Sequence, residues 1–205
     1  LIVFNESLKV SIPRRGGTFS EGIVGTPRFI NPVLAISDAD KDLTQVLYNG
    51  LMKRDKDGAL VPDLAESYTV SEDGKVYTFK LKDNIYFHDD SKVTVDDVTY
   101  TVEMVQNQLI KSPIKTNWEG ITVKKESENV VSFTLKQRYV SFLENTTLGI
   151  LPKRLWVSLT PEQFPLSDLN TKPVGSGPYK MDSVTKNSSG IPTSYTLTSF
   201  NRFIG

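Results

Sequence analysis

LTQVLYNGLM, at residues 43–52, opens the stretch that decides the fold. A turn signal, DKDG at 55–58, follows it, and then VPDLAESYTVSEDGKVYTFKLKDNIYFHDDSKVTVDDVTYTVEMV at 61–105. Apolar residues in the first segment recur near i, i+3, i+4 and i+7, which predicts a helix from Leu43 to about Leu51 with Asp42 as its N-cap. Asp57-Gly58 is typical of a tight turn.

The longer segment predicts a hairpin and then a second helix. Residues 67–70 and 76–81 alternate between apolar and polar side chains on either side of the Glu-Asp-Gly turn at 72–74, which predicts two paired strands. Thr94 with an acid at Asp97 is close to a capping box and predicts a helix over residues 95–109.

The same patterns extend outward in both directions. Residues 18–24 predict a strand that ends at the Gly25-Thr-Pro breaker, and residues 121–125 and 130–136 predict a second hairpin. Short helices are expected at 142–148 and 152–156, and strands at 177–184 and 194–200. This mixture of hairpins and separate helices favours an α/β or α+β layout over a regular βαβ series.

Bulk composition narrows the function classes. Lys plus Arg and Asp plus Glu are both 24, so the formal net charge is zero. No segment has the basic excess of a nucleic-acid binder, and we expect no nucleic-acid partner. The chain has no cysteine, which excludes a thiolate metal site or a cysteine nucleophile.

Several motifs in a fixed order resemble the family-5 extracytoplasmic solute-binding proteins, the receptors of peptide- and nickel-type ABC importers. They are YNGLM (48–52), PDLAESY (62–68), SEDGKVYTFKLKDNIYFHD (71–89), TVDDV (94–98) and KPVGSGPYKM (172–181). No single motif is specific, but two long blocks in the right order are. The resemblance covers nearly the whole chain from Gly16 onward.

The resemblance implies an α/β, type-II periplasmic-binding-protein fold whose first lobe carries an inserted small α/β subdomain. On this mapping residues 1–16 are an N-terminal tail or post-anchor segment and residues 17–40 start the first lobe. Residues 41–168 form the inserted subdomain and residues 169–205 return to the first lobe. The second lobe is absent on this mapping, so we expect the chain to be the N-terminal portion of a longer receptor.

The resemblance also implies where a ligand binds. The segment Gly25–Pro32 matches the loop that follows the first strand and lines the cleft, so Thr26, Pro27, Arg28 and Phe29 are expected to face the ligand. Thr26 stands where relatives have an acid. Three further candidates are Tyr48, Gly177 and Tyr179; for the two tyrosines a role in the core is the open alternative.

Two other candidate sites have structural explanations. His88 is the only histidine, so it has no second histidine with which to form a zinc site or a catalytic set, and we expect a structural role. Asp55, Asp57 and Gly58 resemble the start of a calcium loop, but flanking helix signals are missing, so we expect a turn. We expect no metal and no cofactor.

The implied function is capture of oligopeptides outside the cytoplasmic membrane and delivery to an ABC permease with its ATPase subunits, without enzymatic activity. The receptor would be monomeric, extracytoplasmic and attached to the membrane through a segment upstream of Leu1. A sugar or a nickel complex is the alternative ligand within the family. A structural or adhesion module on the same fold is another alternative, and an enzyme is the weakest.

Overall fold

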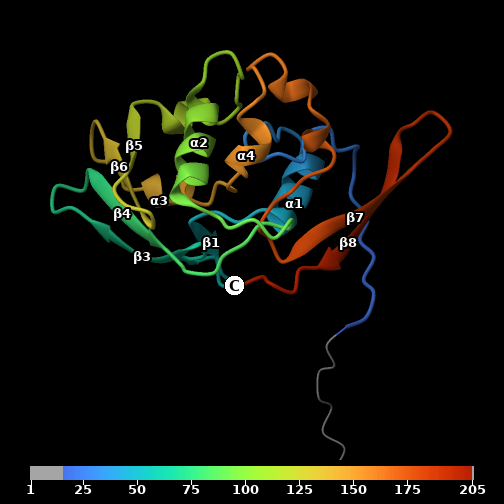
Figure 1. The fold of residues 1–205 in the computed structure, drawn as a ribbon, viewed down its shortest axis with the longest axis horizontal. Helices are drawn as coiled ribbons and strands as arrows, with labels where there is room; N and C mark the ends of the chain where they lie inside the picture. Colours follow the sequence, from blue (N-terminus) through green and yellow to red (C-terminus); the bar gives the residue numbers. More distant parts are fainter. Residues whose placement is uncertain (1–15, 205) are drawn as a thin grey trace, which may run out of the picture.

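A computed structural model describes residues 16–204, in which helices combine with three antiparallel sheets (Figure 1). The largest sheet has four strands in the order β3-β4-β6-β5. Its strands are β3 (Ala65–Val70), β4 (Val76–Leu81), β5 (Ile121–Lys125) and β6 (Val130–Leu135). Both predicted hairpins, β3–β4 and β5–β6, are confirmed.

An aromatic core explains why this sheet forms. Alternation places Tyr77 and Phe79 on the inner face of β4, and Phe133 faces the same way from β6. Phe79 meets Phe133 edge-on with ring centroids 5.6 Å apart, and Phe133 in turn contacts Trp118 and Phe142. Burying each such ring contributes roughly 1.5–3 kcal/mol, so the aromatic face fixes the register of the strands.

Helix α2 (Val95–Gln106) packs on the strands β5 and β6 (Figure 1). Its predicted start is confirmed, because the N–H and hydroxyl of Thr94 both donate to Asp97 Oδ2, at 2.8 and 2.7 Å. The other Asp97 oxygen accepts from Lys153 N at 2.8 Å, at the start of α4 (Lys153–Trp156). Burial raises the pKa of Asp97 and outweighs these hydrogen bonds, so this carboxyl joins two helices at some desolvation cost.

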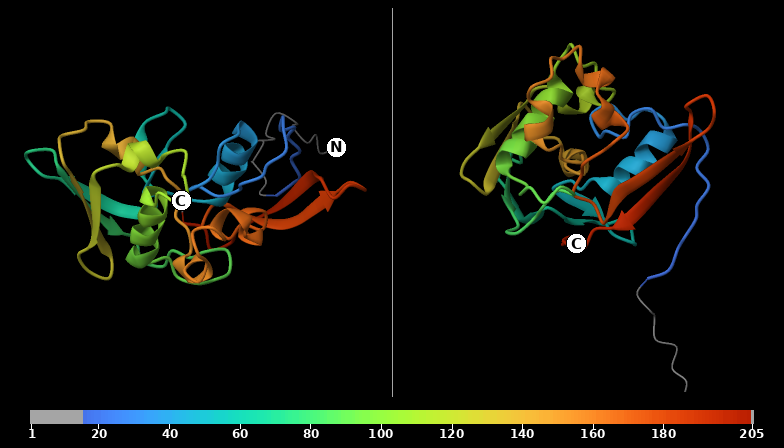
Figure 2. Two further views of the ribbon diagram at one scale, coloured as in Figure 1. Left: turned by 90° about the horizontal axis from the view of Figure 1, so that it is seen from above. Right: turned by 45° about the vertical axis from the view of Figure 1, so that its right-hand side comes forward.

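Two smaller hairpins complete the sheets. They are β1 (Met52–Arg54) with β2 (Leu60–Pro62), and β7 (Tyr179–Lys186) with β8 (Pro192–Ser199). The second hairpin projects at the end of the molecule away from the four-stranded sheet and packs on α1 (Asp38–Leu47) (Figure 2). The remaining short helices are η2 (Lys115–Trp118), α3 (Phe142–Asn145), η3 (Phe164–Leu166) and η4 (Asp168–Asn170).

Two predictions near the N-terminus are wrong. Residues 18–24 form no strand: Phe19 is 86% and Val24 95% exposed, and within residues 16–204 the strands β7 and β8 pair only with each other. An extended segment without a ladder partner is not a strand. The first helix begins at Asp38 after Ser37, not after Asp42, because Ser37 and Asp40 form a capping box.

The proposed domain division remains a prediction. Helix α1 runs through the expected boundary between residues 40 and 41. Most of the segment called a tail, residues 1–15, lies outside the described residues. No helix among residues 16–204 has the length and apolar character needed to cross a membrane.

Candidate functional site

A buried carboxylate in the first turn of α1 holds the loop that carries four of the predicted site residues. Asp40 Oδ1 accepts hydrogen bonds from Arg28 N at 2.7 Å and Phe29 N at 2.9 Å. Its Oδ2 accepts from Ile36 N at 3.3 Å and Ser37 N at 3.1 Å. Burial opposes ionisation, but the hydrogen bonds with Phe29, Arg28 and Ser37 lower the pKa of Asp40, so the loop is fixed by a charged group.

A second anchor holds the same loop from the other side. Ile30 N donates to Asn170 O at 2.8 Å, and Asn31 Nδ2 donates to Asn170 Oδ1 at 2.9 Å. Asn31 Oδ1 accepts from Val33 N at 2.9 Å, so its buried side chain is bonded at both ends. The loop is therefore ordered by contacts that reach from η4 as well as from α1.

The four loop residues present different groups to the surface. Thr26 and Arg28 are exposed, Phe29 is half-buried and Pro27 is buried. The Arg28 guanidinium carbon lies 5.8 Å from the centroid of the Phe29 ring, within the range of a cation–π contact. Thr26 and Arg28 are thus the loop side chains most accessible to a ligand, and Pro27 and Phe29 attach the loop to the core.

Tyr48 lies in the core at the C-terminal end of α1. It is buried, its hydroxyl donates to Ile30 O at 3.4 Å, and burial raises its pKa. Tyr179, the first residue of β7, is 46% exposed. Of the two tyrosines, the structure therefore leaves Tyr179 accessible and uses Tyr48 to support the loop.

Gly177 lies against the backbone of α1. Its N–H donates to Leu47 O at 2.9 Å, and a Cβ added there would lie 2.5 Å from Val46 O. A Cβ added at Gly175 would come even closer to Leu47 O. Glycine is required at both positions because a side chain would collide with helix carbonyls.

His88 is hydrogen-bonded to the glycine segment at residues 175–177 and has the structural role that the sequence predicts. Its Nδ1 accepts from Gly175 N at 3.2 Å and its Nε2 lies 3.1 Å from Gly177 O, so the ring is neutral with its proton on Nε2. Burial lowers the pKa of His88, and the nearby charge of Lys180 acts in the same direction, against the bond to Gly177. Both ring nitrogens are occupied by protein groups.

Helix α1 connects the loop at residues 26–29 and the glycine segment at residues 175–177 through contacts at its opposite ends. Asp40 holds residues 26–29 at its N-terminal end, and Leu47 contacts residues 175–177 at its C-terminal end. Seven residues of helix separate these contacts by about 10 Å. The turn at Asp55 is also as predicted: Asp55 Oδ1 accepts from Asp57 N and Ala59 N, so this carboxylate closes the β1–β2 turn.

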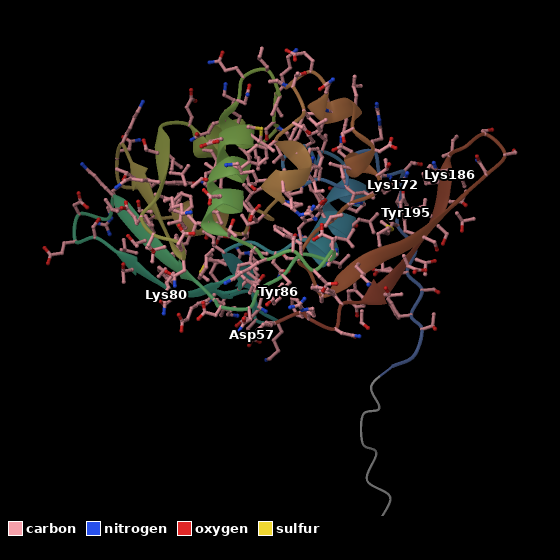
Figure 3. All side chains as sticks on the ribbon, in the orientation of Figure 1. Asp57, Lys80, Tyr86, Lys172, Lys186 and Tyr195 are labelled. Atoms are coloured by element: carbon pink, nitrogen blue, oxygen red, sulfur yellow. The ribbon has the colours of Figure 1, made fainter. Side chains whose placement is uncertain are left out.

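Sequence reasoning missed two residues of this region. Asp40 was detectable from its capping-box spacing after Ser37, but its contact with residues 28 and 29 was not. Tyr195 of β8 is partly buried, and burial together with the negative charge of Asp40 raises its pKa (Figure 3). No local pattern marks Tyr195, since its place depends on the packing of the β7–β8 hairpin against α1.

Comparison with known proteins identifies the family. Residues 59–191 match the model described as "Bacterial extracellular solute-binding proteins, family 5 Middle". The chain is 31% identical over 182 residues to the oligopeptide-binding protein AppA of Bacillus subtilis. This alignment covers 86% of the present chain and 34% of AppA. The chain thus spans about a third of the length of that relative.

Solved structures agree with the fold. The AppA structure from Bacillus subtilis in complex with a nonapeptide superposes with a TM-score of 0.81 at 27% identity, covering 88% of this chain and 36% of that one. The structure of NikZ from Campylobacter jejuni in complex with Ni(L-His) superposes with a TM-score of 0.71 at 33% identity. This match covers 81% of the present chain and 32% of NikZ. These matches confirm the predicted type-II periplasmic-binding-protein fold, and the chain belongs to family 5 of the bacterial extracellular solute-binding proteins.

Proposed function

We propose that this protein is the substrate-binding component of an ABC importer that captures oligopeptides outside the cytoplasmic membrane. The family match and the names of its relatives support this class of function. One observation about the loop at residues 26–29 carries the proposal. Hydrogen bonds to Asp40, and from the adjoining Asn31 to Asn170, fix the loop, while the side chains of Thr26 and Arg28 are exposed. A pre-ordered loop loses little entropy when a ligand binds.

The proposed site has two parts. Thr26 and Arg28 contact the ligand from the loop, and Tyr179 contacts it from the start of β7. Pro27, Phe29, Tyr48 and Gly177 position these segments from beneath. A peptide receptor of this kind satisfies the ligand backbone with strand-like hydrogen bonds and leaves the side chains in roomy pockets, which permits varied sequences.

The proposed mechanism is closure of two lobes on the ligand, followed by docking on a membrane permease whose ATPase subunits supply the energy. In this scheme residues 17–40 and 169–205 belong to the first lobe and residues 41–168 form the inserted subdomain. The receptor acts as an extracytoplasmic monomer, is attached to the membrane through a segment upstream of Leu1, and carries out no bond chemistry.

A nickel complex is the second candidate ligand, favoured by the similarity to NikZ, whose structure contains Ni(L-His). His88, the only imidazole of the chain, already bonds to Gly175 and Gly177 through its two nitrogens. A nickel ion would therefore have to arrive with ligands of its own.

A thermal-shift screen of the full-length protein tests the proposal. Separate arms contain pooled di- to penta-peptides, nickel with histidine, nickel alone, and sugars. A ligand at 100 times its dissociation constant stabilises the native state by about 2.7 kcal/mol. A shift with peptides supports the proposal, a shift only with nickel and histidine selects the second candidate, and no shift in any arm from a folded protein overturns both.

Variants of the loop test the site separately. Arg28→Gln removes the exposed guanidinium and is expected to weaken binding of the active ligand at least several-fold. Lys41→Gln is the matched control, since Lys41 is also exposed and lies on α1, where its partner is Asp38 at 3.7 Å. Equal affinities of Arg28→Gln and the wild type by calorimetry would remove Arg28 from the site while leaving the receptor class intact.

A further inference from the structure

A small cavity lies where four distant segments meet, on the side of the molecule where the described chain ends. Its lining comes from residues 49 and 64 around the β1–β2 hairpin, residues 85 and 86 after β4, Ser176, and residues 202–204. Tyr86 marks its position (Figure 3). The cavity is thus separate from the exposed loop at residues 26–29.

Two buried polar atoms at this cavity have no hydrogen-bond partner among the described residues. They are Asn49 Oδ1 and Ser176 Oγ, on side chains of residues that are 7% and 4% exposed. The amide orientation of Asn49 is fixed, because its Nδ2 donates to the carboxylate of Asp63. Buried polar atoms in folded proteins are normally hydrogen-bonded to protein or to ordered water, so each of the two needs a partner.

A third unpartnered atom is already explained by charge. Asp63 Oδ1 lies 3.4 Å from Lys53 Nζ, and Asp63 does not line the cavity. The unsatisfied pair is therefore an amide oxygen, which only accepts, and a hydroxyl, which both donates and accepts.

The size and charge of the cavity select the ligand. About 10 Å³ is open to the centre of a water-sized sphere, which is close to the minimum that holds one water molecule. A cation is disfavoured because the Arg202 guanidinium lines the site, stacked 3.3 Å from the Tyr86 ring centroid and 3.0 Å from Asp90. An anion is disfavoured because Asn49 Oδ1 cannot donate to it.

We propose that a single internal water molecule binds here and bridges Asn49 and Ser176. It accepts from the Ser176 hydroxyl and donates to Asn49 Oδ1, which satisfies both buried groups. The bridge joins the segment after α1 to the glycine segment that His88 clamps, so Ser176 is held through water while Gly175 and Gly177 are held directly.

Crystallography and oxygen-17 magnetic relaxation dispersion of the full-length protein test this inference. We expect electron density for a water within hydrogen-bond distance of both atoms, and the loss of one long-lived water molecule in Ser176→Val. The control is Ser112→Val, since Ser112 is equally buried but donates directly to Val33 O at 2.7 Å, and its replacement removes no long-lived water.

Two results would overturn the proposal. One is a wild-type crystal structure, at a resolution that defines ordered water, with no density between Asn49 and Ser176. The other is an unchanged number of long-lived waters in a folded Ser176→Val protein. If that variant does not fold, Ser176→Ala takes its place in the relaxation measurement, and the wild-type density is read independently of either variant.

Discussion

Replacing Asp40 tests whether a buried charge holds the loop at residues 26–29. In Asp40→Asn the amide oxygen keeps the bonds to Arg28 N and Phe29 N, but as neutral bonds. A hydrogen bond to a charged group contributes about 1.5–3 kcal/mol and a neutral one about 0.5–1.5, so each bond weakens by about 1 kcal/mol. Ile36 and Ser37 are exposed, and their N–H groups can bind water in the variant. Losing their bonds to Asp40 therefore adds little to the loss of unfolding free energy.

The expected loss of unfolding free energy is therefore about 2 kcal/mol for Asp40→Asn and about 4 kcal/mol for Asp40→Ala, which loses both bonds. Urea denaturation of the full-length protein at pH 7, followed by fluorescence of the buried Trp118 and Trp156, measures both. The control is Asp38→Asn, another acid in the first turn of α1, exposed and paired with Lys41; it should change stability by less than about 0.5 kcal/mol.

The effect depends on pH in a defined direction. The pKa of Asp40 is lower in the folded state than its ordinary value of 3.8. The stabilisation that its carboxylate gives the folded state is therefore complete above pH 3.8 and is lost as the pH falls through the folded pKa. The gap between wild type and Asp40→Asn should therefore narrow below about pH 4. Equal stabilities of Asp40→Asn and wild type at pH 7, or a cost for Asp38→Asn as large as that for Asp40→Asn, would refute the reasoning.

Three further perturbations test other contacts. Gly177→Ala should destabilise by about 1–3 kcal/mol because its Cβ meets Val46 O, whereas Gly22→Ala, with open space around it, should not; thermal melts compare the two. Burial lowers the folded pKa of His88, so wild-type stability should fall as the pH drops from 6.5 through the folded value. His88→Gln should abolish this slope, and a slope that persists in denaturation curves contradicts the assignment. Phe133→Ala should cost about 3–5 kcal/mol by urea denaturation, and a smaller loss would mean that the aromatic core relaxes.

Local signals were sufficient for most of the elements. Both hairpins of the large sheet pair residues close in sequence, and the alternation in β4 marks Tyr77, Phe79 and Leu81 as its buried side chains. The start of α2 was also readable, because Thr94 and Asp97 form a local hydrogen-bonded pair. The motifs that resemble family 5 then supplied the fold, which periodicity alone does not determine.

Long-range contacts account for what the sequence did not predict. Helix α1 ends at Leu47 because the next residues bond elsewhere: Ile150 N donates to Asn49 O, and Met52 N donates to Thr146 O. Periodicity extended the helix to Leu51 since it cannot detect such competition. The support of the candidate site is hidden for the same reason, as the partners of His88 lie 87 and 89 residues away.

The pairing of Asn31 with Asn170 has a consequence for the order of folding. The two residues are 139 positions apart, so their contact requires closure of a very long loop. Hairpins such as β3–β4 close short loops, and their own hydrogen bonds offset the small entropy cost of closure at once. The entropy cost of the Asn31–Asn170 contact is offset only after the intervening chain has folded. The hydrogen bonds of Ile30 and Asn31 to Asn170 should therefore form late, and the amide of Ile30 should gain protection after those of the large sheet in pulse-labelled refolding.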